Sequence, residues 1–150
     1  MRMSCETRLR AIALISLVGL FVAVYLLLYH MGFYGALVCG TDSCEIVQTS
    51  KYARFMGQPV PLWGSLWYGG VLVLAFLGLG PASGKRRLEV LLALATTGGL
   101  VFSIYLTAVE LLVLHAVCMW CVISAVLTVS IFVLARPWRI LSGAVPPVTG

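Results

Sequence analysis

Four cysteines in two closely spaced pairs are the residues of this sequence best suited to chemistry. Cys118 and Cys121 form a C-x-x-C, and Cys39 and Cys44 form a second pair with four residues between them. Residues i and i+3 of a helix share a face, so the sulfur atoms of the first pair can meet. At a helix start, unpaired N–H groups and the helix dipole stabilise a thiolate, which is the form that attacks disulfides. The C-x-x-C therefore predicts thiol–disulfide exchange.

The second pair is expected to lie on a flexible loop. The four residues between its cysteines are all turn formers, namely Gly40, Thr41, Asp42 and Ser43. A mobile pair beside a fixed pair is the arrangement of a relay. The mobile pair exchanges electrons with a soluble protein and the fixed pair with something in the membrane, each step passing through a mixed disulfide.

Two non-enzymatic interpretations of the four cysteines stay open. A C-x-x-C also occurs in structural disulfides and as half of a zinc site, and four thiolates suit tetrahedral zinc. The second hypothesis is therefore a metal-binding membrane protein without redox turnover. The third is a structural membrane subunit in which the loop pair only closes the loop. The leading interpretation is an enzyme that needs no metal, and metal content, disulfide content and thiol turnover distinguish the three.

A thiol relay needs a final electron acceptor. The sequence has neither a haem-ligand pattern nor a nucleotide-binding motif, so a lipid quinone is the natural candidate for a membrane protein. We expect it between the helices, near the outer face and beside the inner cysteine.

Composition indicates a membrane protein. Of the 150 residues, 61% are hydrophobic and only 10% are charged, far less charge than a soluble domain carries. The net charge is +5, but the basic residues cluster between apolar segments and are not interleaved with aromatic residues as in single-strand binders. The chain is therefore expected to have lipid as its surroundings and no nucleic-acid partner.

Four apolar segments predict an all-α membrane protein, a four-transmembrane-helix bundle with an outer cysteine-bearing loop, in one domain spanning residues 1–150. A spanning helix needs about 20 apolar residues. The expected helices cover about residues 9–30, 63–79, 88–111 and 117–135. The first is not read as a signal peptide, because its apolar run is long and no small-x-small cleavage site follows it.

Proline and glycine residues mark the expected helix ends. Pro59 and Pro61 precede the second helix, where proline starts helices, and residues 80–84 (GPASG) end it. The almost wholly apolar segment from Val90 to Ala135 is too long for one crossing, so it must contain two, with a turn near residues 110–117. Small residues on the third helix are expected to pack closely against neighbours: Gly98, Gly99, Ser103 and Thr107.

The distribution of basic residues predicts the orientation, since short basic loops stay in the cytoplasm. Eight basic residues fall on one side: Arg2, Arg8, Arg10, Lys85, Arg86, Arg87, Arg136 and Arg139. Only Lys51 and Arg54 fall on the other. Both termini are therefore expected in the cytoplasm of a multi-pass inner-membrane protein. The four paired cysteines then face the periplasm or exterior, the oxidising side, and Cys5 alone stays inside.

Several other side chains are expected near the outer helix ends. His30, His115 and Glu110 are interpreted first as packing or interface residues, with proton supply to a quinone as the alternative. Trp63 and its neighbours in the second helix, Trp67 and Tyr68, suit a membrane interface. Their alternative role is to cover a quinone ring.

The arrangement as a whole resembles the vitamin K epoxide reductase family in its bacterial form, over about residues 11–135. The matching features are the two cysteine pairs, four crossings and a set of loop residues: Ser50 six positions after Cys44, Gly57-x-Pro59, and Gly64-x-x-x-Tyr68. One C-x-x-C alone would be a weak signal. Together these features are specific.

The resemblance implies a four-helix bundle around a quinone (menaquinone or ubiquinone, vitamin K-like), capped by the loop and a short half-helix. It implies that electrons enter from a thioredoxin-like partner at Cys39. Cys44 then exchanges with Cys118, and Cys121 stands nearest the quinone and reacts with it. Ser50 would be a polar residue near the loop and the active-site pair and, with Trp63, Trp67 and Tyr68, one of the residues that bind the cofactor.

Two departures from the family shape these expectations. Many bacterial relatives carry a fused thioredoxin-like domain, and here the sequence stops after the fourth apolar segment. The partner is therefore expected to be a separate periplasmic thioredoxin-like oxidase. The sequence also lacks a clear counterpart of the polar quinone-contacting residues of the animal enzymes. Reduction of a respiratory quinone, which drives disulfide formation, is therefore expected in place of epoxide reduction.

Overall fold

The computed structural model describes residues 5–35, 38–39, 43–81 and 84–137. Residues 40–42 of the turn-forming loop lie outside the described residues, as do the basic residues Arg2 and Arg139. Both sulfur pairs lie inside the described part of the chain.

Four long helices account for most of the described chain. They are α1 (Cys5–His30), α3 (Val60–Leu79), α4 (Lys85–Val109) and α5 (Met119–Ala135). Each occupies one of the four apolar segments that the sequence marks. At its outer end α4 continues into η2 (Glu110–Leu114), a wider turn in which the Ala116 N–H donates to the Glu110 carbonyl oxygen (3.2 Å).

Three of these helices are long and apolar enough to cross a membrane: α1, α3, and α4 together with η2. The fourth, α5, is equally apolar but has only 17 residues, or about 25 Å at the usual helical rise. Three of the four expected crossings therefore fall on helices of full length, and the fourth expected crossing falls on the shorter α5.

The helix ends lie at the proline and glycine residues that the sequence marks. Pro59 precedes α3 in an extended conformation and Pro61 lies in its first turn, where the missing N–H has no helical partner to lose. Gly80 closes the same helix. At the other end of the chain Arg136 adopts a left-handed conformation (φ 51°) and ends α5 just before Pro137.

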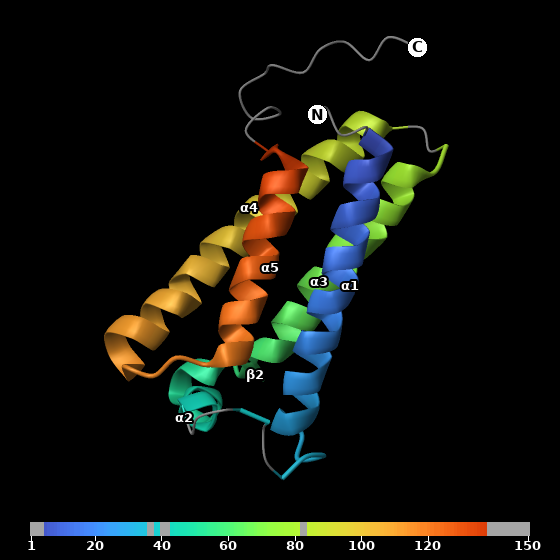
Figure 1. Ribbon diagram of the computed structural model, residues 1–150. Coiled ribbons are helices and arrows are strands. Elements are labelled where there is room, and N and C mark those ends of the chain that lie inside the picture. The colour runs from blue at the N-terminus through green and yellow to red at the C-terminus, as the bar shows by residue number, and fades with distance from the viewer. Residues whose placement is uncertain (1–4, 36–37, 40–42, 82–83, 138–150) are drawn as a thin grey trace.

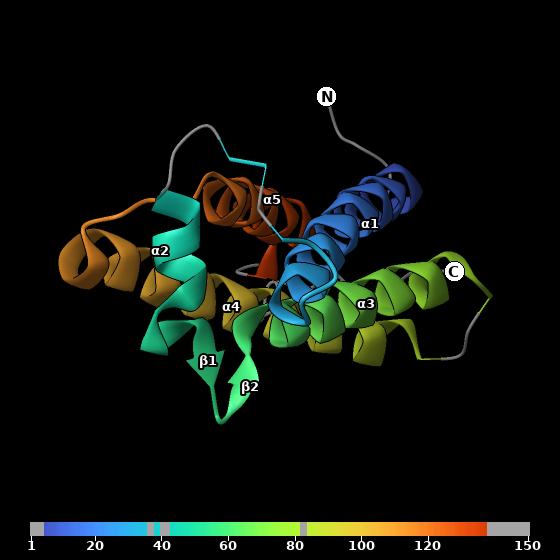
Figure 2. The same ribbon diagram turned by 90° about the horizontal axis from the view of Figure 1, so that it is seen from below.

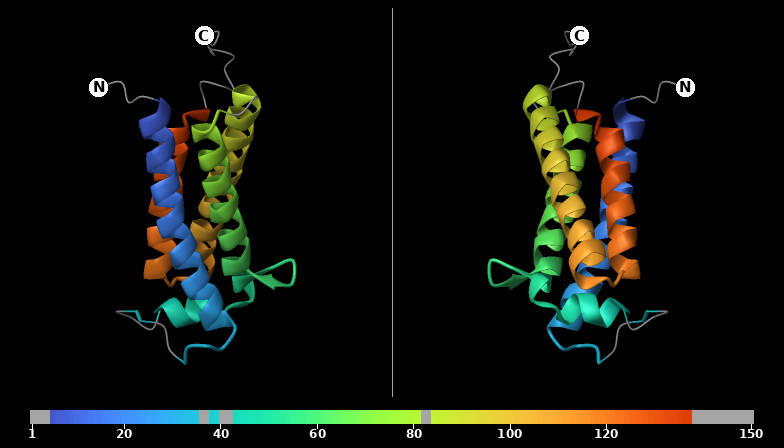
Figure 3. Two further views of the ribbon diagram at one scale, coloured as in Figure 1. Left: turned by 90° about the vertical axis from the view of Figure 1, so that its right-hand side faces the viewer. Right: turned by 90° about the vertical axis from the view of Figure 1, so that its left-hand side faces the viewer.

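The long helices run side by side as one bundle (Figures 1 and 3). Contact is most extensive between α1 and α3, while α5 packs on both α1 and α4, and α4 also contacts α3. The start of α1, the end of α3, the start of α4 and the end of α5 lie at one end. That end carries the described basic residues expected in the cytoplasm: Arg8, Arg10, Lys85, Arg86, Arg87 and Arg136.

The opposite end is capped by the segment between α1 and α3. It contains α2 (Ser43–Thr49), a single turn η1 (Lys51–Ala53), and an antiparallel hairpin of β1 (Arg54–Phe55) and β2 (Gln58–Pro59). The hairpin turn, Met56-Gly57, has positive φ at both residues (54° and 80°), as two-residue hairpins prefer. Figure 2 shows α2 lying across the ends of α4 and α5. The expected all-α bundle with an outer loop did not include this hairpin, whose strands are too short to show a period.

Two glycines let aromatic rings of α3 approach neighbouring helices closely. A Cβ on Gly99 of α4 would lie 2.2 Å from Cζ2 of Trp67, and one on Gly19 of α1 would lie 2.2 Å from Cε1 of Tyr68. Of the small residues expected to pack on α4, Gly99 therefore does so, whereas a Cβ on Gly98 would meet nothing within 4 Å.

Candidate active site

The cap brings the loop cysteines to the start of α5. Cys44 on α2 is 1% exposed and Cys118, directly before α5, is 0% exposed. Both belong to one buried cluster with Val47 and Ala116, and Cys39 and Cys121 pack against it. The two cysteine pairs, far apart in the sequence, therefore meet at one place.

The two pairs are in different redox states. Cys39 and Cys44 are joined by a disulfide with an S–S distance of 1.99 Å, whereas Cys118 and Cys121 are free thiols. An oxidised pair beside a reduced pair is the situation in which exchange between them needs only a thiolate.

Gln48 links the cap to the C-x-x-C. Its side chain is 5% exposed, and its amide Nε2 donates to the sulfur of Cys118 (3.9 Å) and to that of Cys121 (3.7 Å). Donors aimed at sulfur favour the thiolate. Gln48 was missed in the sequence, although it lies four residues after Cys44 and hence on the same face of α2.

Glu110 lies on the other side of the pair. It was expected at a membrane surface, but its side chain is 6% exposed. Oε2 accepts the backbone N–H of Cys118 (3.2 Å), and the carboxyl group also lies beside the Cys121 side chain. The helix end was predicted correctly. Its burial was not, because the cap that covers it is remote in sequence.

These surroundings lower the pKa of the Cys118 thiol to about 7. The largest cause is the hydrogen bond from the Cys121 side chain, which burial partly opposes. The backbone N–H groups of Cys121 and Trp120 and the amide of Gln48 add to the lowering. The two backbone N–H groups belong to the first turn of α5, where backbone donors have no partner within the helix. Cys118 is therefore the thiol of the pair that is prepared to attack the loop disulfide.

We expect attack of Cys118 on the loop disulfide to depend on pH with a midpoint near 7. Above this pH the thiolate dominates and the rate is constant. Below it, the rate falls about tenfold per pH unit, because only the protonated thiol accumulates. The measurement uses Cys5→Ser/Cys121→Ser, in which the serine hydroxyl still donates to Cys118, and follows release of the Cys39 thiol with a chromogenic reagent.

The control for this profile is Cys5→Ser/Cys121→Ala, which removes the largest cause of the lowered pKa. Its midpoint should move above that of the serine variant, toward the ordinary range of a thiol. Equal midpoints in the two variants would show that the Cys121 hydrogen bond does not set the reactivity of Cys118.

Two aromatic side chains hold the backbone just before the loop disulfide. The Val38 N–H donates to the Tyr25 hydroxyl (3.2 Å), and the Trp120 indole N–H donates to the Val38 carbonyl oxygen (3.1 Å). The two rings lie against each other with centroids 5.1 Å apart. Trp120 is the third residue of the C-x-x-C, so this contact ties the position of Cys39 to α5.

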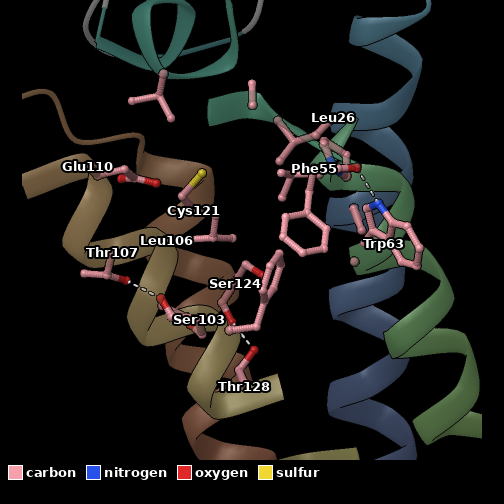
Figure 4. A pocket seen from close by; sticks show the side chains of 18 of the residues that line it. Leu26, Phe55, Trp63, Ser103, Leu106, Thr107, Glu110, Cys121, Ser124 and Thr128 are labelled. Atoms are coloured by element: carbon pink, nitrogen blue, oxygen red, sulfur yellow. Dashed lines mark hydrogen bonds between the residues drawn. The ribbon is translucent and has the colours of Figure 1, made fainter. Parts of the chain in front are cut away.

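A cavity of about 320 Å³ lies beneath the cap, between the helices. Cys121 lines it, whereas Cys118 does not. Figure 4 shows Glu110 and Cys121 on one side of this cavity, with Phe55 and Trp63 facing them from the other. Its size falls within the range of small-molecule sites, and it opens beside one sulfur of the reduced pair.

All four residues predicted to contact a quinone line this cavity: Ser50, Trp63, Trp67 and Tyr68. Their polar groups already have partners in the protein. The Trp63 indole donates to the Phe55 carbonyl oxygen (3.1 Å), and the Trp67 indole donates to that of Ala95 (2.8 Å). The Ser50 hydroxyl donates to the carbonyl oxygen of Val47 (2.8 Å). These groups therefore hold the cavity wall in place and leave aromatic surface for a ligand.

Tyr68 connects the cavity to α5. Its hydroxyl lies 2.9 Å from the Ser124 hydroxyl, 3.0 Å from the Ser124 carbonyl oxygen and 3.2 Å from the Thr128 hydroxyl. Its ring packs edge-on against Trp67 with centroids 4.9 Å apart. The sequence identified the ring but not this network, which joins residues 56 and 60 positions apart.

The two histidines are not among the residues that line the cavity. The His115 ring nitrogen Nδ1 lies 3.1 Å from the Leu111 carbonyl oxygen of its own helix turn, on the exposed side of η2. His30 ends α1. Of the three side chains considered for proton supply, Glu110 is therefore the one that reaches the cavity.

The four-thiolate zinc centre needs all four cysteines as thiolates. Two of them form the loop disulfide. Among residues 5–35, 38–39, 43–81 and 84–137, no group of three or more His, Cys, Asp or Glu side chains converges in a way that could hold a metal ion.

Comparison with known families gives an independent finding. The family model described as "Vitamin K epoxide reductase family" matches residues 10–136 of the chain. The matched region begins in α1 and ends just after α5, so it includes both cysteine pairs, the cap and the cavity.

Proposed function

The chain belongs to the vitamin K epoxide reductase family, whose members are membrane thiol–disulfide oxidoreductases, and from this premise we propose that it oxidises a thioredoxin-like partner at the expense of a quinone. Electrons would pass from the partner to Cys39/Cys44, then to Cys118/Cys121, and from Cys121 to the quinone. The enzyme would thereby generate disulfides in other proteins.

One observation carries this proposal. A loop disulfide and a free dithiol share one buried cluster, and only the dithiol has a sulfur on the cavity. The loop pair, the inner pair and the cavity thus follow one another in the order in which a relay would pass electrons. The loop pair lies on the capped end, where a soluble partner has access. The inner sulfur lies between the helices, where a lipid-soluble molecule has access.

Each exchange in the relay conserves electrons. The partner's dithiol would be oxidised as the Cys39–Cys44 disulfide is reduced. A loop thiolate, that of Cys44, would then attack Cys118 in the oxidised C-x-x-C. The loop disulfide would re-form and leave Cys118 and Cys121 as thiols. The described structure has the redox state that follows this second exchange.

The cavity lining fits a quinone. The rings of Trp63, Trp67 and Tyr68 would hold a flat ring by stacking or edge contact, and Cys121 supplies the reducing sulfur. A bound quinone would supply the acceptor chemistry, taking up two electrons and two protons. The role of this chain's residues is to bind its ring, to exclude water and to hold Cys121 against the cavity.

We infer that α5 also crosses the membrane, so that the bundle spans it four times with both termini in the cytoplasm. Six of the described basic residues lie at the end opposite the cap and only Lys51 and Arg54 in the cap, which supports this orientation. The cap and both cysteine pairs would then face the periplasm or exterior, and the thioredoxin-like partner would be a separate protein there.

The proposal is tested with purified protein, a reduced thioredoxin-like periplasmic protein and a soluble quinone, by following quinone absorbance. We expect quinone reduction with one partner disulfide formed per quinol. Absence of turnover with every quinone, together with about one zinc per chain, would instead support the four-cysteine metal-binding protein.

A further inference from the structure

Glu110 is the buried carboxylic acid of the site. The exchange steps of the thiol relay, as described above, do not use its carboxyl group. Oxidation of Cys118 and Cys121 to a disulfide breaks two S–H bonds and releases two electrons and two protons. The Cys118 proton is easily lost, since its pKa lies at about 7. The Cys121 proton must leave from a sulfur that lies between the helices.

The contacts of Glu110 place it at that proton. One carboxylate oxygen accepts the Cys118 backbone N–H (3.2 Å), which fixes the orientation of the side chain. The carboxyl group also faces the Cys121 side chain, and both side chains line the cavity (Figure 4).

The other groups around this carboxyl cannot take its place. Facing the pair from α2 are the Gln48 amide, which acts as a donor to both sulfurs, and the Cys44 sulfur, which is held in the disulfide. The titratable groups from the α5 end are Cys118 and Cys121 themselves. On the α4 side, His115 is exposed and its ring lies against its own backbone.

From this geometry we propose that Glu110 is a catalytic residue, the proton acceptor for the Cys121 thiol and its proton carrier toward the cavity. The inference rests on the proposed function for the destination of the proton. As the Cys118–Cys121 bond forms, the Glu110 carboxylate takes the Cys121 proton and releases it into the cavity. There, the two electrons of the dithiol, the proton carried by Glu110 and one proton from water would convert a bound quinone to quinol. The proton from water replaces the one that Cys118 has lost, and Glu110 returns to its starting form.

A quinone-free reaction tests this role. In a Cys5→Ser/Cys118→Ala background with the loop disulfide intact, Cys121 is the only free thiol. Its alkylation by iodoacetamide requires loss of the same proton. We expect Glu110→Gln to slow the alkylation about a hundredfold, at the lower end of general-base effects. The amide introduced by Glu110→Gln keeps an oxygen for the backbone N–H of residue 118 and nearly the same volume.

The opposite result would overturn the proposal. If Glu110 acted only as a nearby negative charge, its removal would ease formation of the Cys121 thiolate, and alkylation would be faster. An unchanged or faster rate in Glu110→Gln is therefore incompatible with proton transfer to Glu110. Glu45→Gln, which removes an exposed carboxylate of α2, should leave the rate unchanged.

A second variant shows whether slow alkylation in Glu110→Gln comes from loss of the carboxyl group or from misfolding. Glu110→Asp keeps the carboxyl group on a shorter side chain, and its alkylation rate should lie between those of the Cys5→Ser/Cys118→Ala background with Glu110 and with Glu110→Gln. A rate for Glu110→Asp at or below that of Glu110→Gln would contradict the role. Slow alkylation in Glu110→Gln combined with no quinone turnover in wild type would uphold the role of Glu110 and refute the quinone acceptor.

Discussion

Cys121→Ala should abolish quinone reduction with every electron donor, whereas Cys39→Ala should abolish it only with the protein donor. Cys121 is the sulfur of the inner pair on the cavity, and without it the dithiol cannot be oxidised to a disulfide. Cys39 belongs to the loop pair, which a small dithiol such as dithiothreitol can bypass. With dithiothreitol, Cys39→Ala should stay within about twofold of wild type, or less than about 0.5 kcal/mol of activation free energy.

Quinone absorbance is the readout, with each variant assayed against both donors. Cys39→Ala leaves Cys44 as a thiol, which is able to form a mixed disulfide with Cys118, so Cys39→Ala/Cys44→Ala is assayed beside it. Cys5→Ser is the matched control, because Cys5 is exposed at the start of α1, at the opposite end of the bundle. Equal loss in Cys39→Ala with both donors would contradict a relay in which the loop pair only delivers electrons.

Gly99→Ala should damage both stability and quinone binding, whereas Gly98→Ala should cost no stability. The added Cβ at Gly99 would lie 2.2 Å from Cζ2 of Trp67 and 2.7 Å from its indole nitrogen, so the ring must move. That movement breaks the indole hydrogen bond to the Ala95 carbonyl oxygen and pushes the ring out of the cavity wall. Overpacking of this kind lowers the free energy of unfolding by about 1–3 kcal/mol.

The neighbouring glycine is the control for helix propensity. A Cβ on Gly98 meets nothing within 4 Å, and alanine is intrinsically favoured over glycine in a helix by about 1 kcal/mol. Thermal unfolding in detergent and the KM for a soluble quinone, measured for both variants, separate the two positions. A Gly99→Ala protein with the melting temperature of Gly98→Ala and the KM of wild type would show that Trp67 does not form the wall of the binding site.

The unexpected feature of the site is how many of its polar contacts come from the cap. Gln48 on α2 reaches both sulfurs of the C-x-x-C. The backbone of Val38 is held by hydrogen bonds with Tyr25 and Trp120. The loop is therefore not an independent mobile arm in this redox state. Its disulfide is held at the pair with which it is proposed to exchange.

Local patterns in the sequence were sufficient for the membrane character, the four apolar helices and their ends. Hydropathy acts over about 20 neighbouring residues, and proline or glycine stops a helix wherever it stands, as at Pro59, Gly80 and the Arg136-Pro137 end of α5. The chemistry of the cysteine pairs also follows from residue type and spacing. Local patterns also placed Glu110 near a helix end, because helix ends depend on neighbouring residues.

Burial and partners depended on packing between segments remote in the chain. Gln48 meets Cys118 and Cys121 across 70 and 73 residues, and no periodicity or spacing encodes such a contact. Glu110 becomes a buried partner of the cysteines only because α2 covers the ends of α4 and α5. The cavity likewise exists only where the cap and the long helices enclose a common space. Helix formation follows from neighbouring residues, whereas the site arises where separate elements exclude water together.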